Sequence, residues 1–216
     1  IGSVGIVHQV AWMASSSQPL ISRGMIAGYR NNSLANLRDQ AIGVENYSAV
    51  NDHIPPGALT NSNGQLLHGW QTLLLPYIEE KPLYDRISLD LAWDNPRNFK
   101  ALRIRVPAFA SDWQGRDGGP VNDSKGYPLT DYASNVHVIG GRPRIQPDEI
   151  TDGLSKTILT GEAFSNRKPW GYPANWRDPA EGLNTSPHGF GSSWPGVVQF
   201  SFADGHVKPI SEDIDP

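Results

Sequence analysis

The sequence predicts an α+β protein in which one long N-terminal helix packs against a small antiparallel β-sheet with extensive loops. Three observations support this class. Residues 20–51 carry apolar side chains at helical spacing, and residues 197–210 alternate as a β-hairpin does. Most of the 22 glycines and 18 prolines lie between these two segments, where they indicate turns and loops. The 216 residues suffice for one domain with a single core.

The long helix is expected from about residue 20 to residue 51. Its apolar residues recur at steps of three and four, which places them on one face of the helix. Proline cannot continue a helix and disfavours helical geometry in the residue before it, so Pro55 and Pro56 follow the end of this one. The residues expected on the buried face are Leu34, Leu37, Ala41, Val44 and Tyr47.

The remaining elements are shorter. A short apolar helix interrupted by Pro76 is expected over residues 73–78. Residues 99–106 alternate apolar and basic side chains, which favours a half-buried strand, and further strands are expected at residues 136–139 and 157–159. At the C-terminal end, the alternation of Val198, Phe200 and Phe202 before a turn at Asp204 and Gly205 predicts a hairpin that covers the long helix.

The composition argues against several classes of function. The formal net charge is −4 without a basic block, which argues against nucleic acid as a partner. The absence of cysteine excludes disulfides and cysteine-ligated zinc. None of the short motifs of nucleotide binding or hydrolysis occurs, and the six histidines are scattered singly, so we expect a protein that is not an enzyme and needs no cofactor, with calcium as a candidate ligand.

Residues 1–22 contain no charged side chain, and as a helix they would reach about 33 Å. The run includes several glycines and serines, which makes it too polar for a clear membrane span. Two interpretations stay open. The segment is either a helix that packs among copies of itself, or a partly disordered leader or membrane-proximal stalk.

Several blocks of sequence point to one known family. They are Asn36-Leu37, Asn46-Tyr47 and Ile54-Pro55-Pro56-Gly57 at their family spacing, then Trp70 with Leu74-Leu75-Pro76-Tyr77-Ile78-Glu79, and Thr130-Asp131-Tyr132 and Asp152-Gly153. Together these blocks resemble the DUF1559 family, pilin-like proteins typical of planctomycetes that are named for a motif of His, nine residues and Asp-Gly. The resemblance covers residues 19–211 in order.

The resemblance implies a pilin-like or type II secretion pseudopilin-like subunit, processed as a prepilin and displayed at the cell surface or outside the cell. Residues 1–29 would then be an assembly or membrane-proximal helix and residues 30–216 the globular head. The expected partner is a further copy of the chain, in an oligomer or filament. The residues expected at the assembly interface are Ile1, Val4, Ile6, Val7, Val10, Trp12, Met13, Leu20, Ile21 and Met25.

The chain departs from the family at three places. Trp194 stands where the naming motif has its histidine, and Gly2 stands where a pilin helix carries glutamate. Family members typically carry one cysteine near Ser33 and another near Ala110 and Ser111, and this chain has neither.

Two other classes of function remain as alternatives. One is a secreted carbohydrate- or calcium-binding module, because aromatic rings stack on sugars and several oxygens in one loop suit calcium. The other is a hydrolase that uses Asp152, Glu162, Asp204 and a histidine. For the module, the candidate metal ligands are Asp112, Asp117, Asn122 and Asp123, and the candidate stacking residues are Trp113, Trp170, Trp176 and Trp194. Ordinary turn chemistry and anchoring of loops in a core or a subunit interface also explain these residues.

Overall fold

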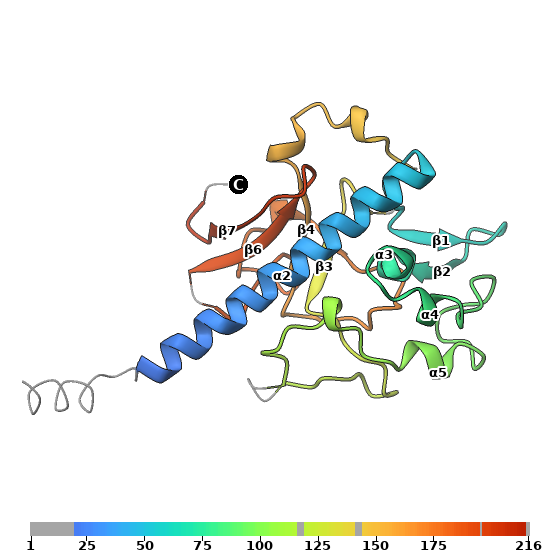
Figure 1. Cartoon of the computed structure of the whole chain (residues 1–216), viewed down its shortest axis with the longest axis horizontal. Coiled ribbons are helices and arrows are strands. Elements are labelled where there is room, and N and C mark those ends of the chain that lie inside the picture. The colour runs from blue at the N-terminus through green and yellow to red at the C-terminus, as the bar shows by residue number, and fades with distance from the viewer. Residues whose placement is uncertain (1–19, 116–118, 141–143, 195, 215–216) are drawn as a thin grey trace, which may run out of the picture.

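The computed structural model describes residues 20–115, 119–140, 144–194 and 196–214, with residues 20–23 described by their helical backbone alone. The fold is α+β, as expected, with the long helix α2 (Leu20–Asn51) lying against a mixed sheet (Figure 1). The sheet contains β3 (Tyr132–Asn135), β4 (Ile158–Glu162), β5 (Trp176–Arg177), β6 (Val197–Phe202) and β7 (Val207–Ser211). Further elements are a second, two-stranded sheet and short helical turns.

The bounds of α2 confirm the predicted helix. Leu37, Ala41 and Val44 are buried as expected, whereas Leu34 and Tyr47 are half-buried. The helix ends where Asp52 takes a positive φ of 61°, and the chain then turns through Ile54 to Gly57. A Cβ at Gly57 would lie 2.3 Å from the carbonyl oxygen of Gly140, so only glycine allows this close passage of two backbones.

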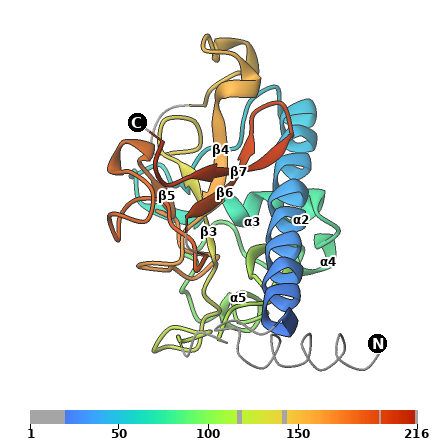
Figure 2. The ribbon, with the colours of Figure 1, turned by 90° about the vertical axis from the view of Figure 1, so that its left-hand side faces the viewer.

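The five-stranded sheet has the order β5-β3-β4-β6-β7. All its neighbouring strands are antiparallel except β3 and β5, which are parallel. The predicted C-terminal hairpin is confirmed as β6 and β7, and Gly205 has the positive φ of 83° that its turn needs. As Figure 2 shows, α2 runs along the sheet, where it contacts β4, β6 and β7.

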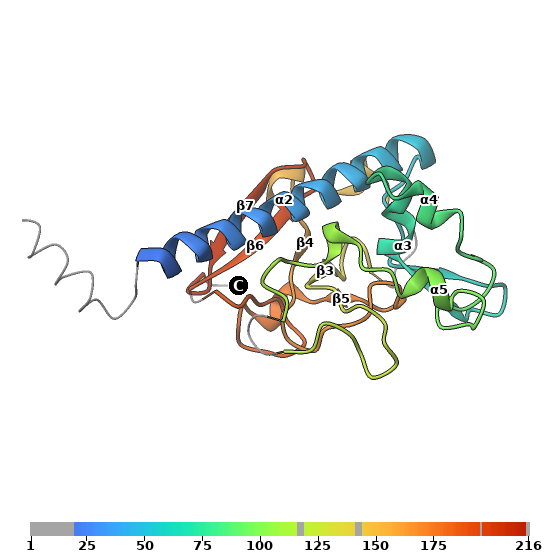
Figure 3. The same ribbon diagram turned by 60° about the horizontal axis from the view of Figure 1, so that its bottom comes forward.

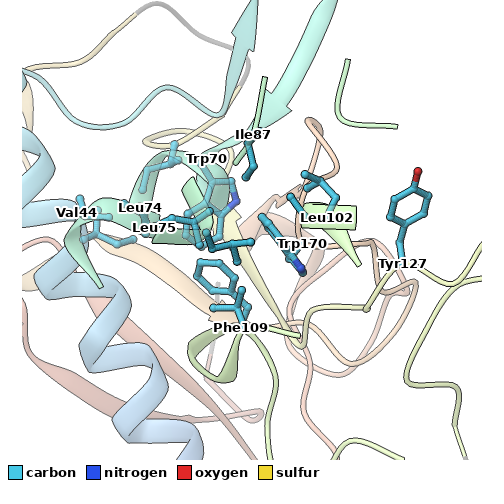
Figure 4. Close-up of a cluster of buried hydrophobic side chains, with 14 of the residues drawn as sticks. Val44, Trp70, Leu74, Leu75, Ile87, Leu102, Phe109, Tyr127 and Trp170 are labelled. Atoms are coloured by element: carbon cyan, nitrogen blue, oxygen red, sulfur yellow. The ribbon is translucent and has the colours of Figure 1, made fainter. Parts of the chain in front are cut away.

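The largest apolar cluster lies beside the C-terminal half of α2 (Figure 4). Its members come from α2, from α3 (Trp70–Leu74) with the following turn η1 (Leu75–Tyr77), from α5 (Phe99–Leu102) and from η2 (Pro107–Phe109). A second cluster joins β3, β4 and β6 around Phe190 and Phe200. The predicted helix with an interruption at Pro76 is therefore confirmed as α3 and η1, and it belongs to the core.

Two predicted strands are wrong. Residues 99–102 form α5, because the Asn98 side chain accepts a hydrogen bond from the Ser88 backbone N–H and donates to the Ser88 and Ala92 carbonyls, which fixes a turn there. The strand expected at residues 136–139 lies four residues earlier, as β3. After β3 the Asn135 carbonyl accepts two backbone N–H groups and turns the chain.

The strand expected at residues 157–159 is confirmed as β4, which begins at Ile158. One hairpin was not predicted. Strands β1 (Ala58–Thr60) and β2 (Leu66–Gly69) pair around a turn that includes Asn61, whose side-chain oxygen accepts the backbone N–H groups of Asn63 and Gln65. The sequence indicated only a loop there. The remaining short helices are α4 (Lys81–Tyr84), η3 (Pro147–Glu149), η4 (Leu154–Lys156) and η5 (Pro179–Glu181).

Candidate functional site

The buried face of α2 is partly polar. Ser33, Asn36 and Gln40 follow one another at steps of three and four and are 0%, 7% and 0% exposed. A buried polar group that lacks a hydrogen-bond partner destabilises a fold, so each of these side chains needs a partner from the head. The partners come from β3, β4 and the segment at residues 108–112.

The central partner is Glu162, the last residue of β4, which is fully buried. Its Oε1 accepts from Ser33 Oγ at 2.6 Å, from Trp194 Nε1 at 3.0 Å and from Gln199 Nε2 at 3.2 Å. Its Oε2 accepts from the Gln199 backbone N–H at 2.9 Å. Because all these partners donate, the position suits an acceptor-only carboxylate.

The charge on Glu162 depends on two opposing effects. Burial disfavours the ionised form, and this effect outweighs the hydrogen bonds from Ser33, Gln199 and Trp194, so the pKa of Glu162 rises to about 7. The nearby Asp131 carboxyl raises the pKa further. The protonation state of a buried group at the contact between α2 and the sheet therefore changes near neutral pH.

Tyr132 pairs with Glu162 across β3 and β4 and extends the contact along α2. Its hydroxyl donates to Ser33 Oγ at 3.1 Å and accepts from Asn36 Nδ2 at 3.1 Å. Burial raises the pKa of Tyr132 well above its ordinary value, so the hydroxyl keeps its proton. Asn36 also donates to the Ala110 carbonyl at 3.3 Å, and Gln40 donates to the Ala108 carbonyl at 2.7 Å. We call Ser33, Asn36, Gln40, Tyr132 and Glu162 the polar seam.

A second buried carboxylate stands beside the polar seam. Asp131 accepts from Arg167 Nη1 at 3.0 Å and Gln114 Nε2 at 3.3 Å on one oxygen, and from the Ser111 backbone N–H at 2.8 Å on the other. Burial raises the pKa of Asp131, although the ion pair with Arg167 opposes the rise. Asp131 thereby fixes residues 111–114, the segment next to α2.

Aromatic rings cover this region in a row. Tyr29 of α2 lies 5.3 Å from Trp113, and Trp113 lies 5.3 Å from Trp194, measured between ring centroids. Trp194, expected to face a ligand, is only 3% exposed, and its indole N–H is used by Glu162. Buried carboxylates with raised pKa values often mark catalytic sites. Here both have donor partners on each oxygen and no exposed surface, which favours a structural role.

Comparison with known families agrees with the motifs. The family model described as "Protein of unknown function (DUF1559)" matches residues 27–186. The chain belongs to the DUF1559 family. Neither the curated proteins nor the solved structures contain a significant match to it.

The DUF1559 match contains every residue of the polar seam. It ends before Trp194 and the β6–β7 hairpin. The segments around Ser33 and around Ala110 and Ser111 lie side by side in this structure. The Asp112 backbone N–H donates a hydrogen bond of 3.1 Å to Oδ1 of Asn32, the residue before Ser33. The Asn36 side chain donates a hydrogen bond to the Ala110 carbonyl. Hydrogen bonds thus join residues 32–36 of α2 to residues 110–112.

The other candidate ligand-binding residues are dispersed. Trp170 is 1% exposed in the main apolar cluster, and its Nε1 donates to the Ile104 carbonyl at 2.9 Å, whereas Trp113 and Trp176 are half-buried. Asp123 Oδ1 accepts the backbone N–H groups of Lys125 and Tyr127, as in an ordinary turn. Asp112 and Asn122 are exposed, and Asp117 lies outside the described residues. Within the described residues, no group of three or more His, Cys, Asp or Glu side chains could hold a metal ion.

The residues suggested for a hydrolase do not meet. Asp152 and Asp204 are exposed, whereas Glu162 is buried. Ile158, at the other end of β4 from Glu162, pairs with Phe202 next to the turn that carries Asp204. Most of the length of β4 therefore separates the carboxylate of Glu162 from that of Asp204.

Of the expected assembly residues, Met25 is the one whose side chain the structure describes, and it is 49% exposed. Ile1, Val4, Ile6, Val7, Val10, Trp12 and Met13 lie outside the described residues, as do the side chains of Leu20 and Ile21. The sequence did not indicate the polar seam, because a periodic apolar pattern marks a buried helix face and polar side chains on that face do not stand out. The three-residue and four-residue steps of Ser33, Asn36 and Gln40 on the same face were the available signal.

Removal of the Ser33 hydroxyl should destabilise the protein. The Ser33→Ala change takes a donor from Glu162 and an acceptor from Tyr132, both buried, and should lower the free energy of unfolding by about 1–3 kcal/mol. Ser48→Ala is the matched control. Among the described residues the Ser48 hydroxyl bonds to the Val44 carbonyl of its own helix, and its loss should change stability by less than about 0.5 kcal/mol. Denaturant unfolding measures both, and equal effects would contradict the role of the polar seam.

Stability should fall as the pH rises from about 4.5 to about 7. Over this range Glu162 keeps its proton in the folded state and loses it in the unfolded chain, which favours unfolding by up to about 3 kcal/mol. Above pH 7 this contribution is constant. Denaturant unfolding at several pH values should show a smaller decline in Glu162→Gln than in the wild type, with the exposed Glu181→Gln as the matched control for loss of one carboxylate. The same pH dependence in wild type and Glu162→Gln would show that Glu162 does not titrate as stated.

Proposed function

We propose that this DUF1559 protein is a structural subunit of a pilin-like filament or pseudopilus at the cell surface or outside the cell, and that it assembles through its N-terminal helix. The observation that carries the proposal is the projection of α2 beyond the head. The polar seam and the apolar cluster hold α2 from Ser33 to its C-terminal end. The N-terminal turns of the helix extend beyond the head (Figure 3).

The projecting part makes few contacts with the rest of the chain. Cβ atoms added at Gly24 and Gly28 would meet no heavy atom within 4 Å outside the helix, and Met25 and Ala27 are exposed. Tyr29, against Trp113, begins the contact with the head. Isolated helices are marginally stable in water, so a helix with few tertiary contacts to the described residues at one end suits burial against further copies of the chain.

A rigid attachment of the helix fits such a role. A filament subunit transmits force between its helix and its head, and the polar seam fixes the two by hydrogen bonds as well as by apolar packing. None of the helices in the described part of the chain is long and apolar enough to cross a membrane. The proposal therefore rests on the projecting helix and the family membership.

The alternatives lack a supporting observation of this kind. A glycan-binding module needs exposed aromatic faces, and the rings of Trp170 and Trp194 lie in the interior. A hydrolase needs carboxylates that a substrate can reach, and Glu162 and Asp131 are both 0% exposed. We accordingly propose a structural rather than a catalytic role, with the chain itself as the partner.

Loss of the N-terminal segment should abolish assembly. Electron microscopy and size-exclusion chromatography of the full chain should show filaments or large oligomers, and a variant without residues 1–22 should be a monomer. Met25→Asp should weaken assembly in the full chain, because it adds a charge to the projecting surface. Ile42→Asp is the matched control, since Ile42 is an apolar residue of similar exposure, 43%, on the part of α2 that the head holds.

A full chain that stays monomeric at every concentration would contradict the proposed function. Equal loss of assembly in Met25→Asp and Ile42→Asp would show that the projecting end has no special role.

A further inference from the structure

A groove lies at the opposite end of α2 from the projecting part. It has a volume of about 740 Å³ and is bounded by the C-terminal half of α2, residues 146–154 and the β6–β7 turn, all of which lie at the same end of the molecule in Figure 2. Val44, Ile54 and Leu159 are buried at its apolar base. Leu154, also in its lining, is 39% exposed, which is high for a large apolar side chain. We call this surface the α2 groove.

The α2 groove is acidic. Four carboxylates line it, those of Glu45, Asp52, Asp148 and Asp204, and its described lining contains no lysine or arginine. Asp204 pairs with His206, whereas no described ion pair includes Glu45, Asp52 or Asp148. A ligand that fits this surface combines apolar side chains with positive charge.

The projecting end of α2 has the complementary composition. The chain contains no Asp or Glu before Asp39, while Arg23, Arg30 and Arg38 all precede it. Positions 23 and 30 are seven residues apart and therefore lie on one face of the helix, with the exposed Ala27 between them. Met25 supplies further exposed apolar surface on the same turns, on the opposite side of the helix from positions 23, 27 and 30.

Neither Arg23 nor Arg30 has an acidic partner on its own part of the helix. No Asp or Glu lies within four residues of either position, which is the distance at which side chains pair along a helix. Ion pairs with carboxylates from outside the helix would therefore stabilise these arginines. The four carboxylates of the α2 groove belong to the same chain, but they line the far end of α2. They are therefore available to the arginines of another copy.

We propose that the α2 groove receives the projecting end of α2 from a second copy of the chain, with Arg23 and Arg30 of one copy facing Glu45 and Asp148 of the next. The inference deepens the proposed function, on which it rests, by naming the surface that receives the helix. Such a contact joins two different surfaces, so a pair of copies still has one unused helix end and one unused groove. An interface of this type extends into an open assembly rather than closing as a symmetric dimer.

Charge reversal on either surface tests this contact. The variants are R23E/R30E on the helix and E45K/D148K in the α2 groove, each made in the full chain and checked for unchanged thermal unfolding. Each variant alone should associate about tenfold or more weakly than the wild type in sedimentation velocity, because two attractive pairs become repulsive. Asp90→Lys and Arg97→Glu, both exposed and outside the groove lining, are the matched controls and should assemble as the wild type does.

Mixing the two variants gives the sharper result. R23E/R30E keeps an acidic groove for the wild-type helix of E45K/D148K, and its own negatively charged helix matches the positively charged groove of that variant. The mixture should therefore regain assembly, with the two variants alternating. The chain that carries all four changes should regain self-association, since the pairs are restored with exchanged signs. Association of the wild type should also weaken as salt is added.

The outcomes separate this inference from the proposed function. If the wild type assembles and the reversal variants assemble equally well, the α2 groove is not the receiving surface and the proposed function stands. If the wild type assembles but the mixture of the two variants does not, and the fourfold variant stays a monomer, the pairing of these surfaces is wrong. If the wild type does not assemble, both the inference and the proposed function fail.

Discussion

The hydrogen bond from Ser33 to the buried carboxylate of Glu162 is the contact on which the architecture depends. It joins the middle of α2 to the centre of the sheet, and the partners of both residues extend it to β3, β6 and the segment at residues 108–112. Burial of a carboxylate is unfavourable unless every oxygen has donors, so these elements must assemble together. The polar seam therefore fixes α2 to the head, and among the described residues the helix before Tyr29 has few contacts with the head.

Much of the fold follows from patterns within the sequence. The bounds of α2, its buried residues Leu37, Ala41 and Val44, and the C-terminal hairpin were predictable, because each depends on a long periodic segment with clear end signals. The strand expected at residues 99–106 failed for the opposite reason. Its alternation is short, and Asn98 binds the backbone at residues 88 and 92, a contact that no local pattern shows. The parallel pairing of β3 with β5 likewise depends on distant residues.

The candidate site was less predictable. The motif containing Asp131 and Tyr132 helped to identify the family, but the roles of Tyr132 and Glu162 depend on contacts with Ser33 and Asn36, about a hundred residues away. Tryptophans in segments rich in glycine and proline look exposed, yet Trp170 and Trp194 are interior because such segments fold back over the core. The assembly residues before residue 20 lie outside the described residues. The basic composition of the projecting helix was visible in the sequence, whereas the α2 groove requires three segments brought together by the fold.

The central claim is that α2 has two parts, one held by the head through the polar seam and one left for other copies. Amide hydrogen exchange along the helix tests this claim most directly, because exchange reports local opening residue by residue. In the unassembled protein, amides at residues 33–48 should exchange slowly and those at residues 24–31 much faster. On assembly the second group should become protected. Uniform slow exchange along the whole of α2 in the unassembled protein would contradict the account.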